Sequence, residues 1–176
     1  MKYDLDALKN EVDAEKLLSA ADIPDLDLYM DQLLTLINGK GEAPAALTKT
    51  MVNNYSKEKI IAPVKGKKYT KEQVLQIYTV FLLKNTLSMG EIKAALTDFY
   101  AESEDEHLLE KAYQRFNEGA AGDVEDVFSL LRQKFPDSEA AVEEDHFVML
   151  LHVCFYSRLF QQLAKKMIAG ITENKS

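Results

Sequence analysis

Hydrophobic positions along most of the chain recur three and four residues apart, which is the spacing of amphipathic helices. A first, loose stripe predicts a helical arm over residues 4–18. Asp22 is then expected to cap a longer helix that carries Pro24 in its first turn. Asn38 and Gly39 are typical helix-ending residues, so this second helix is predicted to end there.

Three capping boxes, each a Ser or Thr followed three residues later by Glu or Gln, mark further helix starts. They begin at Thr70, Ser88 and Ser103. Thr48 can also cap a short helix, over residues 48–58. That helix cannot continue far, because Pro63 disfavours the helical conformation in the residue before it.

The C-terminal part is expected to form three helices. Gly119 and Gly122 would separate the first from the second, and Pro136 would end the second. The last would run from about residue 139 to 168, with a middle that is apolar on nearly all faces, so it is either a central core helix or a subunit interface. The pattern therefore predicts an all-α protein with at most a small β-ribbon near residues 61–69.

The 176 residues include only seven glycines and four prolines, which favours a helical protein. Other features of the composition favour the cytoplasm. One cysteine allows no intramolecular disulfide, which is typical of a reducing compartment. No basic segment leads into an apolar run at the N-terminus, so no signal peptide is expected. The most apolar stretch, residues 147–160, is too short and too polar to span a bilayer, so no membrane association is expected.

The charge is unevenly distributed around the net value of −8. Residues 48–93 carry nine lysines and three acidic residues, whereas both flanking parts are strongly acidic. Seven of these lysines lie between Lys49 and Lys71. A negative chain disfavours indiscriminate nucleic-acid binding, but a local basic block allows a focused contact. A solvated, lysine-rich surface is the simpler alternative.

Short polar side chains within the basic block suit the reading of bases. Asn53 and Asn54 are consecutive on the short helix, and asparagine can pair with adenine through two hydrogen bonds. No arginine occurs in residues 1–114, so specificity would depend on adenine, thymine or DNA shape. The candidate DNA-binding residues are Lys49, Thr50, Asn53, Asn54, Lys57, Lys65, Lys67, Lys68 and Tyr69.

Motifs for catalysis or metal binding are weak. Two Glu-x-x-His spacings, Glu104–His107 and Glu143–His146, have the form used in di-iron helical bundles, but both lie in acidic runs near predicted helix starts. His152 and Cys154 are two residues apart and would point to different sides of a helix, so Cys154 is read as core filling. No enzyme activity, cofactor or metal is predicted.

The order of helix, loop, short helix, basic hairpin, helix and helix is that of a winged helix-turn-helix. Residues 47–96 resemble the DNA-binding part of MerR-type regulators. The matching positions are the cap Thr48, Tyr55, the apolar-proline step 60–63, the Gly-containing wing 64–68, the cap Tyr69-Thr70 and the final helix start 87–92. Three features depart from that pattern: the turn over residues 38–47 is long, Asn53 and Asn54 replace Arg and Tyr, and Lys59 stands where a turn glycine is common.

Three further segments resemble a family catalogued as bacterial domain of unknown function 1836. They are Ile23–Gln32, Leu47–Tyr55 and Lys67–Tyr69. This resemblance brings no settled function.

Together these features predict two domains: a MerR-like winged helix-turn-helix module with a helical arm over residues 1–100, and a helical domain over 101–176. The resemblance to MerR-type regulators implies a transcriptional regulator that binds double-stranded DNA and forms a homodimer, for which the last helix is the expected interface. It also implies an effector of unknown identity. An effector pocket could form among Tyr113, Phe116, Phe128, Phe147 and Phe155. The same five residues could equally form a packed core. The alternative function is a protein-interaction module that keeps the winged-helix shape without binding DNA.

Overall fold

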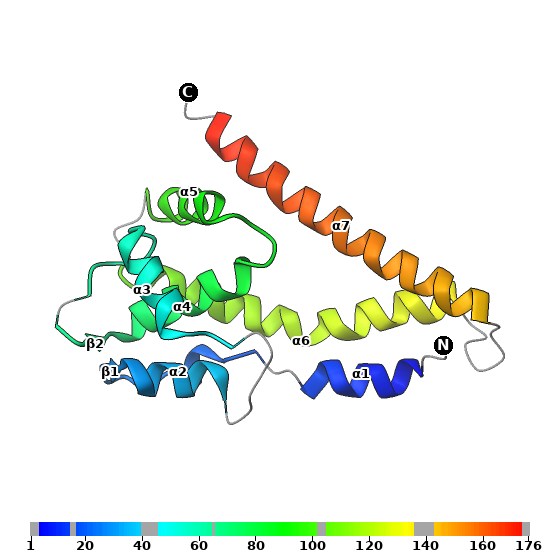
Figure 1. Ribbon diagram of the computed structural model, residues 1–176, viewed down its shortest axis with the longest axis horizontal. Helices are drawn as coiled ribbons and strands as arrows, with labels where there is room; N and C mark the ends of the chain where they lie inside the picture. Colours follow the sequence, from blue (N-terminus) through cyan, green and yellow to red (C-terminus); the bar gives the residue numbers. More distant parts are fainter. Residues whose placement is uncertain are drawn as a thin grey trace. The chain divides into compact units, whose positions relative to one another are not determined.

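A computed structural model describes residues 4–14, 17–39, 46–64, 66–101, 105–135 and 143–173. These residues form helices and one small two-stranded sheet, which confirms the predicted all-α class. The elements are α1 (Leu5–Ala14), the 3₁₀ turn η1 (Ala20–Asp22), β1 (Leu28–Tyr29), α2 (Met30–Asn38), α3 (Lys49–Lys57), β2 (Lys68–Tyr69), α4 (Lys71–Leu83), α5 (Met89–Tyr100), α6 (Leu108–Lys134) and α7 (Glu143–Glu173) (Figure 1).

The chain divides into two compact units. The first, here called the arm unit, comprises residues 1–17 and 115–163. The second, here called the core unit, comprises residues 18–114 and 164–176. Helices α6 and α7 therefore each contribute to both units. The domain division at residue 100 stays a prediction.

Helix α4 is the centre of the core unit. Seven of its thirteen residues are buried, including Val74, Ile77 and Val80, which are almost fully shielded from water. Helices α2, α3 and α5 each bury one or two large side chains in the same cluster, among them Leu33, Val52 and Ile92. The apolar stripe of α4 thus faces partners on several sides, and burial of these side chains stabilises the unit.

Capping boxes start the helices α4 and α5 where the sequence predicted them. The side-chain oxygen of Gln73 accepts a bond from the Thr70 backbone N–H at 3.0 Å, and the Thr70 hydroxyl accepts one from Gln73 N–H at 3.3 Å. Ser88 and Glu91 exchange the same pair of bonds at 2.7 and 3.3 Å. The predicted box at Ser103 lies outside the described residues.

The predicted helix start at Asp22 is wrong. Ser19 caps the short turn η1 instead, and the Asp22 carboxylate reaches back to the Ser19 backbone N–H at 3.3 Å. The chain is then extended, and α2 begins only at Met30. The side-chain oxygen of Gln32 accepts a bond from the Tyr29 backbone N–H at 2.9 Å, which stabilises this later start.

The small sheet pairs segments that are far apart in the sequence. β1 and β2 are antiparallel, with Leu28 opposite Tyr69 and Tyr29 opposite Lys68. The ribbon predicted near residues 61–69 is therefore confirmed for β2. Its partner strand was expected in the same hairpin, but β2 pairs with β1, which precedes α2. Leu28 and Tyr69 are both buried, so a shared apolar contact explains the pairing. The winged helix-turn-helix arrangement stays a prediction.

Asn38 closes the long connection between α2 and α3. Helix α2 ends there, and Gly39 follows with a φ of 66°, a conformation that glycine adopts readily. The Asn38 side chain accepts a bond from the Leu47 backbone N–H at 2.8 Å and donates one to the Leu47 carbonyl at 2.9 Å. These two bonds tie the end of α2 to the start of α3 across the connection.

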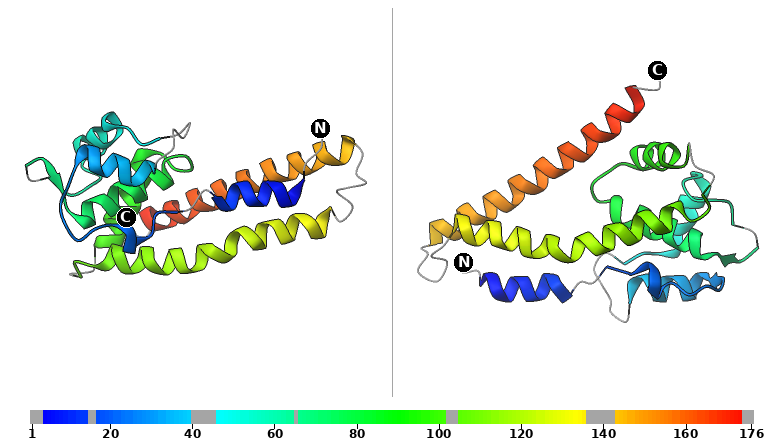
Figure 2. Two further views of the ribbon diagram at one scale, coloured as in Figure 1. Left: turned by 90° about the horizontal axis from the view of Figure 1, so that it is seen from below. Right: turned by 180° about the vertical axis from the view of Figure 1, so that it is seen from behind.

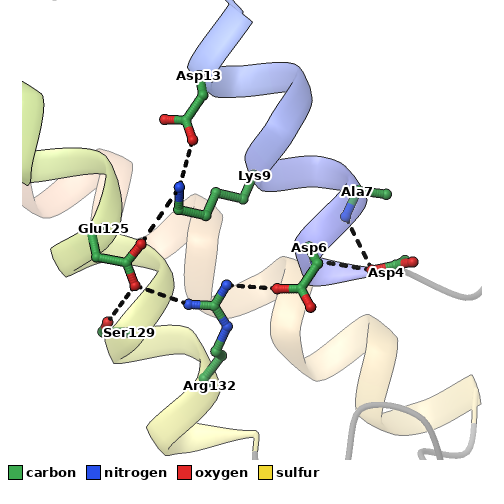
Figure 3. Close-up of polar contacts among 8 residues, drawn as sticks. All are labelled: Asp4, Asp6, Ala7, Lys9, Asp13, Glu125, Ser129 and Arg132. Carbon is green, nitrogen blue, oxygen red and sulfur yellow. Dashed lines mark hydrogen bonds and ion pairs between the residues drawn. The ribbon is translucent and has the colours of Figure 1, made fainter.

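The arm unit joins α1 to the second half of α6 through ion pairs. Both views of Figure 2 show α1 running beside this part of α6. Arg132 pairs with Asp6 at 2.7 Å and with Glu125 at 3.2 Å, and Lys9 lies 3.5 Å from Glu125 (Figure 3). The small core beneath these pairs consists of Leu5, Phe128, Leu131 and Met149. The predicted helical arm is confirmed by α1.

Helix α6 runs without interruption through both of its glycines, so the predicted break at Gly119 and Gly122 is wrong. The residues around these glycines are mostly good helix formers, and buried side chains anchor the helix at Tyr113 before them and Phe128 after them. The expected three C-terminal helices are therefore the two long helices α6 and α7.

Helix α7 exposes most of its large apolar side chains. The exposed ones are Phe147, Leu150, Leu151, Val153, Phe155, Leu159, Phe160, Leu163 and Met167. Only a few residues are buried or packed on a core, such as Met149 in the arm unit and Ile168 in the core unit. Of the two predictions for this helix, the central core helix is wrong.

Candidate nucleic-acid interface

Helix α3 has one buried and one exposed face. Val52 and Tyr55 are buried in the core unit, and Met51 packs against the same cluster. The exposed face carries short polar and basic side chains, at positions one, two, five, six and nine of the helix, which places them on one side. These residues are Lys49, Thr50, Asn53, Asn54 and Lys57, five of the nine predicted DNA-binding residues.

Both ends of α3 are fixed by local interactions. The Thr48 hydroxyl accepts a bond from the Met51 backbone N–H at 3.3 Å, which confirms the predicted cap. At the other end the Ile60 backbone N–H donates to the Tyr55 carbonyl at 3.0 Å, and Lys59 adopts a φ of 54°. Lys59 thus has the left-handed conformation in which helices commonly end and which glycine adopts more easily.

The exposed face of α3 is positively charged, and no negative charge on the helix balances its lysines. The helix contains no acidic residue. Within the part of the chain that the structure describes, Lys49, Lys57 and Lys67 form no ion pair. Asn53 and Asn54 are exposed and form no side-chain hydrogen bond with another described residue, so the pair does not cap or turn the chain.

The wing residues differ in their environments. Lys67 and Lys68 are exposed, and the Lys68 ammonium lies 5.0 Å from the centre of the Tyr29 ring. Lys65 lies outside the described residues. Tyr69 has only 7% of its surface exposed and belongs to the hydrophobic core, where burial raises the pKa of its hydroxyl. The assignment of Tyr69 to a DNA-binding surface therefore needs correction, because its side chain supports the fold.

Other lysines of the basic block are engaged elsewhere. Lys71 pairs with Glu110 at 2.8 Å and with Asp25 at 3.0 Å, and these hydrogen bonds raise its pKa. The Lys84 ammonium lies 4.3 Å from the centre of the Phe81 ring, and partial burial lowers its pKa. The positive charge directed to solvent thus comes from α3, from Lys67 and Lys68 near β2, and from the exposed Lys59 and Lys93.

Two buried glutamines hold the segment between α3 and β2. The side-chain oxygen of Gln76 accepts a bond from the Ala62 backbone N–H at 2.8 Å, and the Gln73 amide donates to the Pro63 carbonyl at 2.9 Å. The sequence interpretation missed this role and a cavity of about 660 Å³ beside the same segment. The sequence contained two signals for these features. Gln73 and Gln76 are polar residues in a mostly apolar helix, and Lys59 stands where a turn glycine is common.

The weaker alternatives from the sequence do not form sites in the described residues. No group of three or more His, Cys, Asp or Glu side chains there could hold a metal ion. Glu104 lies outside the described residues, and His146 is buried. Cys154 is exposed, so its assignment to the core is wrong.

The aromatic residues proposed for an effector pocket do not share one cluster. Tyr113 belongs to the core of the core unit and Phe128 to that of the arm unit. Phe116, Phe147 and Phe155 are exposed. The effector pocket stays a prediction.

Comparison with known proteins assigns a family. Residues 18–116 match the family model described as Domain of unknown function (DUF1836), which covers more than half of the chain. The chain belongs to the DUF1836 family. No curated protein and no solved structure matches it. The DUF1836 match nearly coincides with the first segment of the core unit, residues 18–114, so the exposed face of α3 lies within the family's domain.

A membrane-spanning helix is absent from the part of this DUF1836 protein that the structure describes, since none of its helices there is both long and apolar enough.

Proposed function

We propose that this protein is a DNA-binding transcriptional regulator that contacts duplex DNA through the exposed face of α3 and through the wing, residues 63–69, without the buried Tyr69. The observation that carries the proposal is the composition of that face, which consists of lysine, threonine and asparagine only. A regulator of this kind acts in the cytoplasm, and no catalytic step is part of the proposal.

The chemistry of the face suits a nucleic acid. Lys49 and Lys57, at either end of α3, can neutralise phosphates, and Lys67 and Lys68 add two further charges near β2. Asn53 and Asn54 lie between the two lysines of the helix, where their amides can reach base edges. The lysines would provide affinity and position, and the asparagines would provide preference for adenine.

A homodimer through α7 is part of the same proposal. Five exposed apolar residues recur at a spacing of four and form a ridge along the helix: Phe147, Leu151, Phe155, Leu159 and Leu163. Such ridges pack into the grooves of a second helix. Two copies related by a two-fold axis could place two α3 helices about one DNA turn apart, as dimeric helix-turn-helix proteins do.

Charge removal on α3 tests the proposal. The double variant Lys49→Gln/Lys57→Gln should bind a duplex of mixed sequence more weakly and lower the salt slope by about 2, because two phosphate contacts are lost. The matched variant Lys111→Gln/Lys134→Gln removes two exposed lysines of α6 and should leave both quantities unchanged. Fluorescence anisotropy at several salt concentrations measures both. Equal losses in the two variants would contradict a specific role of α3.

The alternative function is a protein-interaction module that does not bind DNA. The exposed apolar surface of α7 favours it, since such a surface fits a protein partner as well as a second copy. A folded protein that binds no duplex at low salt, but captures a partner through α7, would support this alternative.

A further inference from the structure

A cavity of about 660 Å³ lies in the core unit beside the C-terminal end of α3. Its walls come from the segment that follows α3, from α4 and from α5. The residues that matter for its chemistry are Lys59, Ile61, Gln76, Lys93, Leu96 and Tyr100. This volume lies within the range of about 300–1,000 Å³ that is typical of small-molecule sites.

The walls are mostly apolar, and the charges on them are positive. Ile60, Ile61 and Leu96 are buried residues that line the cavity. Lys59 and Lys93 are exposed residues of the same lining, which contains no acidic side chain. The Lys93 ammonium donates a bond to the Glu58 backbone carbonyl at 2.9 Å, so it is held in place without being neutralised by a carboxylate.

Lys59 occupies its position at a conformational cost. Its φ of 54° is in the left-handed region, where glycine is less strained than any residue with a side chain. A lysine is less favourable than glycine for the turn itself, and glycine can therefore replace it without loss of the turn. The cavity that Lys59 lines is one place where its ammonium group can act.

Hydrogen bonds hold the polar side chains Gln76 and Tyr100 of the cavity lining. The Tyr100 hydroxyl donates to the Glu72 carboxylate at 2.7 Å and accepts a bond from the Gln76 amide at 3.3 Å. Gln76 in turn accepts from the Ala62 backbone N–H. Tyr100 and Gln76 therefore already have hydrogen-bond partners within the protein. A ligand would be recognised instead by the two lysines and the apolar walls.

We infer that this cavity binds a small organic anion, a carboxylate with an aliphatic or aromatic body. The carboxylate would lie near the ammonium groups of Lys59 and Lys93, and the body would pack on Ile60, Ile61 and Leu96. The inference goes beyond the proposed function, because it concerns a different ligand. The cavity adjoins the proposed DNA-binding surface at Ser56 and Pro63, but neither Lys59 nor Lys93 belongs to that surface, so the two proposals can be tested separately.

The test is a titration of the ¹⁵N-labelled full chain with octanoate and with 1-naphthoate, followed by NMR. Either acid should shift the backbone amides of Ile61, Ala62 and Thr97 in a saturable way, with a Kd of about 1 mM or lower. Their neutral amides, octanamide and 1-naphthamide, serve as probes without the charge and should bind at least about fivefold more weakly, because they lack the ion pairs.

Variants connect the binding to the two lysines. Lys59→Gly and Lys93→Gln should each weaken the binding of the acid about fivefold. Lys59→Gly should not lower the melting temperature, since glycine accepts the left-handed conformation, so loss of binding cannot be ascribed to unfolding. Lys49→Gln, an exposed change on α3 away from the cavity lining, should leave the binding unchanged.

Three results would overturn the inference. One is the absence of saturable shifts at these amides with both acids. Another is equal binding of the acids and their neutral amides. The third is unchanged affinity in both Lys59→Gly and Lys93→Gln, which would show that the lysines do not recognise the anion.

Discussion

Asn38 is a side chain that holds the two ends of the long α2–α3 connection together. It makes two hydrogen bonds to the backbone of Leu47, which is itself buried. Asn38→Ala leaves both backbone groups without these partners and should lower the free energy of unfolding by about 1–3 kcal/mol. Urea denaturation measures this change.

The control for this prediction is Asn53→Ala, an exposed asparagine on α3, which should change the free energy of unfolding by less than about 0.5 kcal/mol. Similar effects of the two changes would mean that the Asn38 bonds do not stabilise the connection.

At the residue scale, the helix caps could be predicted from the sequence, but the burial of individual side chains could not. The caps Thr48, Thr70 and Ser88 were predicted because a cap depends on residues within one turn of the chain. Tyr69 and Cys154 were misassigned because the burial of each depends on elements distant in the sequence. The five candidate residues on α3 were predicted from their charge and polarity, and they share its exposed face because their spacing is helical.

The continuity of α6 can be tested at its glycines. Gly122 is helical, and no neighbouring atom would meet an added Cβ. Gly122→Ala should therefore raise the free energy of unfolding by about 0.5–1 kcal/mol, because alanine has the higher helix propensity. Differential scanning calorimetry or urea denaturation measures the gain.

The opposite sign is expected at Gly66, whose φ of 77° is in the left-handed region. Gly66→Ala should lower the free energy of unfolding by about 1 kcal/mol, because a side chain is strained in this conformation. If Gly122→Ala were also destabilising, the chain would break at that point as the sequence pattern had indicated.

At the element scale, the errors of the sequence interpretation have a common cause. Glycines within α6 and the Asp-Ile-Pro-Asp segment are ambiguous signals, each compatible with a break or a start. Long-range contacts decide them: buried residues on both sides of the α6 glycines keep the helix intact, and the pairing of β1 with β2 keeps residues 28–29 extended. No local pattern contains that information.

The whole molecule is expected to be a dimer through α7. Phe155 lies at the middle of the apolar ridge with 53% of its surface exposed, so a charge there should not disturb the core of the chain. Phe155→Glu should yield a monomer, because a buried carboxylate in the interface is unfavourable. Analytical ultracentrifugation measures the mass in solution.

Leu26→Glu is the matched control, since Leu26 is also exposed, at 60%, and lies in the core unit. It should leave the dimer intact. A wild-type protein that is monomeric at micromolar concentration would contradict the proposed interface on α7.

At this scale the sequence predicted the helical class and the family, and the division into domains at residue 100 stays a prediction. Each unit combines two segments that are distant in the sequence, residues 1–17 with 115–163 and residues 18–114 with 164–176, and α6 and α7 contribute to both units. Hydrophobic spacing indicates which face of a helix is apolar, but not which distant element covers it.

The most direct test of the central claim is the salt dependence of duplex binding by the wild-type protein. Fluorescence anisotropy with a duplex of mixed sequence should show binding at about 50 mM salt that weakens steeply as salt increases. A slope of log K against log salt of roughly −4 or steeper would correspond to four or more phosphates and would support α3 and the neighbouring lysines as a DNA-binding surface. No binding at low salt by a folded protein would contradict the claim.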